Sequence, residues 1–141
     1  MSTKIRSKIS TKNPYYIPKF RYLELSYFCR QYPTWKREYF ELTASGGLSA
    51  IDYTRPKVDN KTVQDPTADV AIRMETLKTW IDMVETTAKE TDPIISNYIL
   101  KAVTENLSFT NLKTVCDIPY ERDAYYTRYR KFFWLLNTTR N

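Results

Sequence analysis

Glycine is scarce in this chain, and this scarcity constrains the fold more than any other feature of the sequence. The 141 residues contain two glycines, adjacent at Gly46 and Gly47. Tight β-hairpin turns and phosphate-binding loops both depend on glycine, whose backbone adopts positive φ angles and lets a ligand approach closely. The sequence therefore predicts an all-α protein, a small helical bundle, in which residues 44–64 form a linker.

Residues 19–43 have the apolar spacing of helices. From Lys19 onwards, apolar side chains recur every three or four positions and so line one face of a helix. Pro33 interrupts the pattern and suits the first turn of a second helix, expected at 34–43, because a missing N–H costs little there. The sequence leaves open whether this region is one kinked helix or two. The side chains expected to face inward are Tyr22, Leu25, Phe28, Cys29, Tyr32, Trp35, Tyr39 and Leu42.

Two Asp-Pro pairs predict the starts of two further helices. Asp65 is a natural N-cap and Pro66 fits the first helical position, and we expect this helix to end near Thr91. A second Asp-Pro pair at 92–93 precedes another amphipathic segment. Because so short a turn separates the two helices, we expect residues 65–106 to form an antiparallel αα-hairpin. The predicted inward positions are Val70, Met74, Leu77, Ile81, Val84, Ala88, Ile95, Tyr98, Ile99, Ala102 and Val103.

The segment 107–137 has the arrangement of a helix-turn-helix. Ser108 can cap a short helix at 109–115, a four-residue break follows at 116–119, and a longer basic helix is expected at 120–137. This is the pattern that places the second helix in the major groove of DNA. Packed helices in a bundle can show similar breaks, so the pattern by itself leaves both interpretations open. The residues expected to face inward are Leu112, Val115, Ile118, Tyr125, Tyr129, Phe132, Phe133 and Leu136.

The position of each polar side chain in this segment predicts its role on DNA. The first turns of a recognition helix reach the base edges, which makes Arg122, Asp123, Tyr126 and Thr127 the candidate base readers. An arginine there can bind guanine through two hydrogen bonds. The candidate phosphate contacts, which add affinity without reading sequence, are Arg130 and Lys131 further along the helix and Thr110 and Lys113 on the short helix.

The positive charge lies at the two ends of the chain. The first 21 residues contain six basic residues and no acidic one, and residues 120–141 contain five basic and two acidic residues. Residues 22–119 contain 11 basic and 14 acidic residues. Such asymmetry is typical of a chain that binds a polyanion, most often nucleic acid. For the N-terminal segment, a solvated tail that aids solubility fits the sequence equally well. We interpret residues 1–18 as a flexible basic arm and residues 19–141 as a single helical domain. The arm's candidate phosphate contacts are Lys4, Arg6, Lys8 and Lys12.

Two aromatic residues of the arm have two possible uses. Tyr15 and Tyr16 lie among basic residues, where they could stack on exposed bases or insert beside a minor groove. They could equally pack against the helical body.

The composition also excludes most catalytic machinery. The chain has no histidine, which rules out the familiar nucleophile–histidine systems and histidine metal ligands. Cys29 and Cys116 stand far apart in apolar surroundings and are expected to be reduced core thiols. We predict no enzyme activity, no metal and no cofactor. No apolar run is long enough to span a membrane and no secretory signal is evident, so we expect a protein in the cytoplasm of a bacterial host.

Several stretches resemble one family of phage proteins. They are YFCRQYPTWKREY at 27–39, DPTADVAIR at 65–73, DPIISNYILKAVTENLSFTNLKTVCDIP at 92–119 and IPYERDAYYTRYRKFFWLL at 118–136. Together they resemble small phage and prophage proteins of Firmicutes described as RinA- or ArpU-like transcriptional regulators, which have a helix-turn-helix similar to that of sigma-factor region 4. The resemblance covers most of residues 20–137. It implies control of phage gene expression through binding of double-stranded DNA near promoters.

A different class of function fits the same sequence. Small basic phage proteins can bind host RNA polymerase or a nucleic-acid-handling defence complex such as a CRISPR nuclease, as inhibitors or adaptors. In that case the helix-turn-helix would bind a protein partner instead of DNA, because one fold can host either role. We also expect a homodimer, since a helix-turn-helix reader gains affinity from two half-sites.

Overall fold

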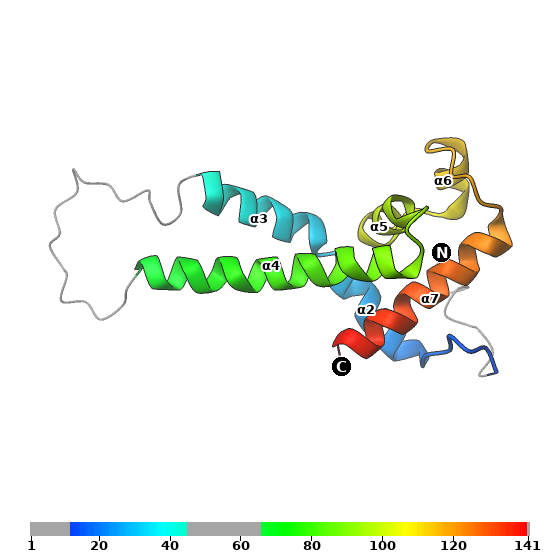
Figure 1. Ribbon diagram of the computed structural model, residues 1–141, viewed down its shortest axis with the longest axis horizontal. Helices are drawn as coiled ribbons and strands as arrows, with labels where there is room; N and C mark the ends of the chain where they lie inside the picture. Colours follow the sequence, from blue (N-terminus) through cyan, green and yellow to red (C-terminus); the bar gives the residue numbers. More distant parts are fainter. Residues whose placement is uncertain (1–11, 45–65, 141) are drawn as a thin grey trace, which may run out of the picture. The chain divides into compact units, whose positions relative to one another are not determined.

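The computed structural model describes residues 12–44 and 66–140, which form helices and no strands (Figure 1). The predicted all-α fold is therefore confirmed. Of the predicted linker at 44–64, Ala44 is the last residue of α3 and 45–64 lie outside the described residues, as do the cap Asp65 and the arm residues before Lys12. In chain order the helices are α2 (Lys19–Cys29), α3 (Tyr32–Ala44), α4 (Pro66–Thr91), α5 (Ser96–Glu105), α6 (Phe109–Thr114) and α7 (Arg122–Arg140).

The described residues divide into two compact units. One unit contains 12–32 and 82–140, and the other contains 33–44 and 66–81. Helix α4 contributes residues to both units. With 26 residues and a rise of 1.5 Å per residue, α4 extends for about 39 Å, longer than the ~30 Å of a typical small domain. A single hydrophobic core about 30 Å across therefore cannot cover the full length of α4.

The region around Pro33 consists of two helices. Helix α2 ends at Cys29 and α3 starts at Tyr32, so Pro33 lies in the first turn of α3, as predicted. Proline has no N–H and cannot continue the hydrogen-bond ladder of α2 through the carbonyl of Cys29. The last turn of α2 closes instead through the N–H of Gln31, which donates to the carbonyl of Phe28 at 3.2 Å.

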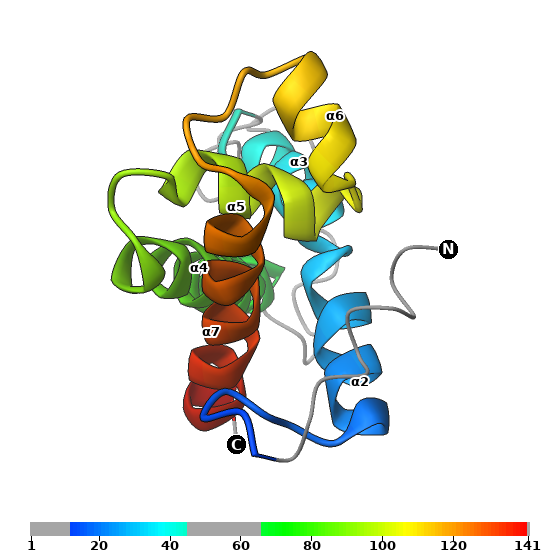
Figure 2. The same cartoon turned by 90° about the vertical axis from the view of Figure 1, so that its right-hand side faces the viewer.

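The core of the larger unit is built where α2, α5, α6 and α7 meet. Helix α2 contacts both α7 and α5, and α5 also contacts α6 and α7. Figure 2 shows α2 and α7 alongside each other, with α5 across one end of the pair. The hydroxyls of Tyr22 and Tyr129 lie 2.8 Å apart inside this core. Burial of each large apolar side chain contributes about 1.5–3 kcal/mol. The core includes the predicted inward residues Leu25, Ile99, Leu112, Ile118, Tyr125, Phe132 and Leu136.

The expected antiparallel hairpin of residues 65–106 is wrong in its geometry. Helix α4 begins at Pro66 and ends at Thr91, as predicted. Figures 1 and 2 show, however, that α5 crosses the end of α4 steeply, and the partners of α5 are α2, α6 and α7. The second Asp-Pro pair does not cap α5 either. The carboxylate of Asp92 accepts from the N–H of Ile94 at 2.9 Å, and the turn continues to Ile95, so that α5 starts at Ser96.

The smaller unit is held by aromatic and ionic contacts. The rings of Trp35 and Trp80 lie 5.3 Å apart, and Trp35 is buried. Arg73 donates two hydrogen bonds to the carboxylate of Glu38, at 2.7 and 2.9 Å, and its guanidinium lies over the Trp80 ring. Half-buried side chains complete the contact where the sequence predicted inward ones: Tyr39, Leu42, Val70 and Met74.

Candidate nucleic-acid interface

The short helix before the basic helix begins as predicted. The hydroxyl oxygen of Ser108 accepts from the N–H of Asn111 at 3.2 Å, which caps α6. Leu112 and Ile118 are fully buried. The prediction for Val115 is wrong, because its side chain is 76% exposed. Val115 is the C-cap residue of α6, and its N–H still donates to the carbonyl of Asn111 at 2.9 Å.

The connection from α6 to α7 is longer than the predicted turn. Residues 115–121 are not helical, whereas a helix-turn-helix usually has about three or four residues here. The predicted helix start at Tyr120 is also wrong. The first carbonyl to accept an α7 hydrogen bond is that of Glu121, from the N–H of Tyr125 at 2.9 Å. Helix α7 therefore begins at Arg122, and it continues past the predicted end at Asn137 to Arg140.

Lys113 holds this connection in place. Its ammonium group donates to the carbonyl of Ile118 at 3.1 Å and lies 3.8 Å from the carboxylate of Glu121. The backbone turns at Asp117, which has a φ of 56°, an angle that aspartate tolerates better than most residues. The sequence predicted a phosphate contact for Lys113, and the structure gives this lysine a role inside the protein. Thr110, the other candidate on α6, is exposed.

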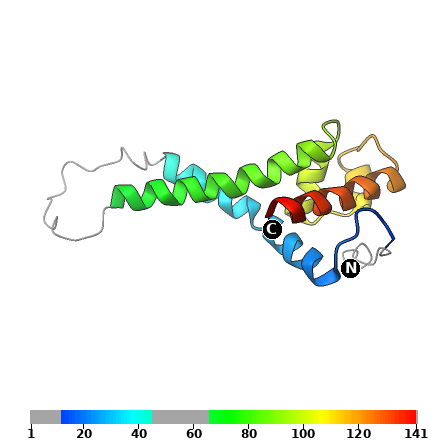
Figure 3. The same cartoon turned by 60° about the horizontal axis from the view of Figure 1, so that its bottom comes forward.

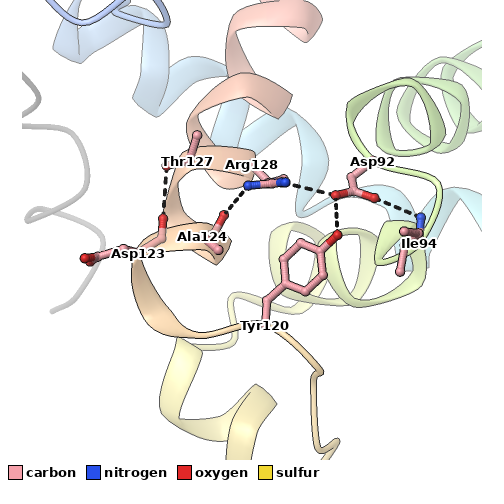
Figure 4. A network of polar contacts seen from close by, with 7 residues as sticks. All are labelled: Asp92, Ile94, Tyr120, Asp123, Ala124, Thr127 and Arg128. Atoms are coloured by element: carbon pink, nitrogen blue, oxygen red, sulfur yellow. Dashed lines mark hydrogen bonds and ion pairs between the residues drawn. The ribbon is translucent and has the colours of Figure 1, made fainter.

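The start of α7 is fixed by a buried carboxylate from the end of α4 (Figure 4). One oxygen of Asp92 accepts from the hydroxyl of Tyr120 at 2.8 Å and from Nε of Arg128 at 3.1 Å. Arg128 also donates to the carbonyl of Ala124, and its guanidinium stacks over the Tyr120 ring. The sequence did not identify Arg128 as the partner of Asp92, because an ion pair over such a sequence distance leaves no local signal.

These contacts determine the ionisation of Asp92. Burial opposes the charged form, but the hydrogen bonds from Tyr120, the N–H of Ile94 and Arg128, with the positive charge of Arg128, outweigh it and lower the pKa of the Asp92 carboxyl. The same hydrogen bond to Asp92 raises the pKa of the Tyr120 hydroxyl. Asp92 is therefore ionised at neutral pH and forms a charge-assisted contact with α7.

Arg122 lies at the first position of α7 on an aromatic support. Its guanidinium carbon is 5.2 Å from the centre of the Phe109 ring and 5.9 Å from that of Tyr126. Phe109 is buried, whereas Arg122 is exposed. Tyr126 is half-buried and its ring packs against Tyr125 and Phe109, so the candidate base reader Tyr126 supports Arg122 in this structure. Stacking restricts the guanidinium while leaving its N–H edge able to donate.

The remaining candidates lie along the outer side of α7. Asp123 and Thr127 are exposed, and the hydroxyl of Thr127 donates to the carbonyl of Asp123 at 3.0 Å. Arg130 and Lys131 are half-buried. Among the described residues, no carboxylate pairs with the basic groups of Arg122, Arg130 or Lys131. The structure therefore brings these three basic side chains onto one helix with their charge uncompensated.

Part of the predicted arm is packed against the protein. Lys12 is exposed, whereas Lys4, Arg6 and Lys8 lie outside the described residues. The ring of Tyr15 meets that of Trp134 on α7 edge to face, with centroids 5.5 Å apart. Of the two uses considered for Tyr15, packing on the body is the one observed. The sequence could not identify Trp134 as the partner, since nothing local to either residue predicts this contact.

Other kinds of site are not found among the described residues. No group of three or more side chains there could hold a metal ion, and no described helix is long and apolar enough to cross a membrane. A comparison of the chain with known protein families, with curated proteins and with solved structures finds no match.

Proposed function

We propose that the protein is a phage-derived transcriptional regulator that binds duplex DNA through α7. The observation that carries this proposal is that Arg122, Arg130 and Lys131 have no ion-pair partner among the described residues, on a helix with one buried face. Such a helix is docked firmly on the body and presents cations to a polyanion. The resemblance of residues 20–137 to RinA- and ArpU-like regulators leads to the same function.

Residues at the start of α7 and residues further along it would make different kinds of contact with DNA. Arg122 is stacked on Phe109 and Tyr126, so little side-chain freedom is lost when its N–H edge meets an acceptor. Guanine offers two acceptors that match this edge, which is worth about 1–3 kcal/mol of discrimination. Arg130 and Lys131, two turns further along, would bind phosphate and contribute affinity without sequence preference.

Duplex binding at two salt concentrations tests the proposal. The probe is a fluorescently labelled random-sequence duplex library, about three helical turns long so that a site and its flanks fit. We expect wild-type affinity to fall with salt by about 0.9 log units per log unit for each phosphate contacted. The double variant Arg122→Ala, Arg130→Ala should bind more weakly and less steeply with salt.

A matched control separates the site from net charge alone. The double variant Arg37→Ala, Lys89→Ala removes the same charge from exposed positions outside α7 and should bind like the wild type. Equal binding by the α7 variant and the wild type would rule out α7 as the reading helix. Equal losses in both double variants would show that only total charge matters.

One observation favours the second class, a protein that docks on host machinery. Helix α2 has exposed aromatic side chains, Phe20 at 78% and Tyr27 at 58%, with basic groups stacked on both: Lys19 over Phe20 and Arg30 over Tyr27. Aromatic residues and arginine are enriched at protein interfaces. A pull-down from host lysate, with and without nuclease, tests this role. A nuclease-resistant partner that the Phe20→Ser, Tyr27→Ser variant loses would favour it over DNA binding.

A further inference from the structure

The fold brings together the two basic ends of the sequence. Residues 1–21 contain no acidic residue, and neither do residues 124–140. Arg21 Nε donates to the side-chain oxygen of Asn137 at 2.5 Å, and Tyr15 packs on Trp134. Figures 2 and 3 show the segment 12–18 passing beside α7 before it enters α2. Segments more than 100 positions apart thus form one surface.

The N-terminal side of this surface is held by its own turn. The N–H of Tyr15 donates to the side-chain oxygen of Asn13 at 2.8 Å, and the N–H of Tyr16 donates to the carbonyl of Asn13 at 3.0 Å. Ile17 is buried, with 6% of its side chain exposed, and anchors the segment that follows. Tyr15 is therefore fixed against α7 by contacts on both sides.

The surface combines basic groups with an aromatic face. We define the terminal patch as Tyr15, Arg130, Lys131 and Trp134. Arg130 and Lys131 lie four and three residues before Trp134, so all three share one side of the helix. Trp134 remains 38% exposed. The Nε of Arg130 is buried and has no hydrogen-bond partner among the described residues. A ligand with both anionic oxygens and apolar faces would match the terminal patch.

We propose that the terminal patch binds the sugar-phosphate backbone of duplex DNA beside the site read by Arg122. Phosphates would meet Arg130 and Lys131, and the sugar would pack against Trp134. Trp134 follows Arg122 by 12 positions, about 18 Å at 1.5 Å per residue. That distance corresponds to roughly five base steps at 3.4 Å. The patch thus contacts the duplex outside the stretch that Arg122 can read, and it binds without sequence preference.

This inference rests on the proposed function. Tryptophan emission reports on the terminal patch, whereas duplex anisotropy reports on DNA binding as a whole, so failure of one can be told from failure of the other. The other tryptophans, Trp35 and Trp80, belong to the smaller unit, whereas all residues of the terminal patch belong to the larger one. The test titrates the intact protein with the labelled random-sequence duplex, following duplex anisotropy and tryptophan emission together. We expect the emission of the wild type to change with the same midpoint as the anisotropy. The Trp134→Phe variant should still bind the duplex, but its tryptophan emission should stay constant during the titration. The Trp80→Phe variant should show the same emission change as the wild type.

A charge variant gives a second, independent measurement. Lys131→Gln should lower the salt dependence of binding by about 0.9 log units per log unit, the loss of one phosphate contact. Circular dichroism checks that each variant remains folded. If the tryptophan emission of the wild type is unchanged when the anisotropy shows that the duplex is fully bound, the terminal patch is overturned. The proposal that α7 reads the DNA sequence would then still stand. An emission change seen only with single-stranded DNA would overturn it too.

The remaining outcomes separate the two proposals. If the emission changes but an Arg122→Ala variant binds like the wild type, the reading role of Arg122 fails and the terminal patch stands. A wild-type protein that binds no duplex overturns both.

Discussion

Nε of Arg128, in the second turn of α7, donates a 3.1 Å hydrogen bond to the carboxylate of Asp92, the residue that follows α4. The same oxygen accepts from the hydroxyl of Tyr120, just ahead of α7. One carboxylate therefore holds both the connection that precedes the basic helix and the helix itself. The orientation of Arg122 and its neighbours depends on this contact, although Asp92 belongs to neither α6 nor α7.

Replacing Asp92 should destabilise the larger unit. Asp92→Ala leaves Arg128 and Tyr120 without their acceptor, and loss of a hydrogen bond to a charged group costs about 1.5–3 kcal/mol. Urea denaturation measures the free energy of unfolding. Glu90→Ala, at an exposed position two residues earlier, is the control and should change it by less than about 0.5 kcal/mol. Similar values for both variants would show that the contact adds no stability.

The contribution of Asp92 should depend on pH with a defined sign. Its pKa in the folded protein is lowered, so its stabilisation is present above the unfolded value of about 3.9 and is lost as the pH falls through the folded value. The difference in unfolding free energy between wild type and Asp92→Asn should therefore be constant from about pH 7 to 5 and shrink below about pH 4. A difference that grows on acidification would contradict this assignment.

The two thiols should differ in reactivity. Burial raises the pKa of Cys29, more than the nearby charge of Arg140 lowers it, and the side chain is inaccessible. Cys116 is half-buried. A colorimetric thiol reagent should modify Cys116 in the native protein and Cys29 only after unfolding. Cys116→Ser should abolish the native reaction, and a rapid native reaction in that variant would show that Cys29 is exposed.

Mutation of two apolar residues in the connection should change the stability of the protein to very different extents. Ile118 is fully buried, and Ile118→Ala should cost about 2–5 kcal/mol by leaving a cavity. Val115 is largely exposed, so Val115→Ser should change stability by less than about 0.5 kcal/mol. Thermal unfolding of the two variants tests the pair. A large loss in Val115→Ser would restore the inward position that the sequence suggested.

Local signals predicted the ends of several elements correctly. Pro66 opens α4, Thr91 closes it and Ser108 caps α6, because capping and proline placement depend on neighbouring residues alone. The start of α7 was misplaced for the opposite reason. The sequence predicted a helix from Tyr120, but the side chain of Tyr120 is hydrogen-bonded to Asp92, 28 positions earlier. No local pattern contains that partner.

Only part of the candidate site could likewise be predicted from the sequence. Helical periodicity correctly separated the buried face of α7 from the side that carries Asp123 and Thr127. It could not show that Lys113 is used inside the protein, since its acceptor is the carbonyl of Ile118 in an irregular loop. Nor could it show that Tyr126 supports Arg122, because that depends on the position of the Phe109 ring.

The sequence by itself determined that the chain is helical, where α4 begins and ends, where α6 begins, and that basic residues concentrate at its two ends. Spacing, caps and composition are properties of neighbouring residues. The tertiary structure decided which helix packs on which, and that Tyr15 meets Trp134 so that the two basic ends share a surface. These contacts join residues far apart in the chain, and their geometry follows from how the aromatic core packs.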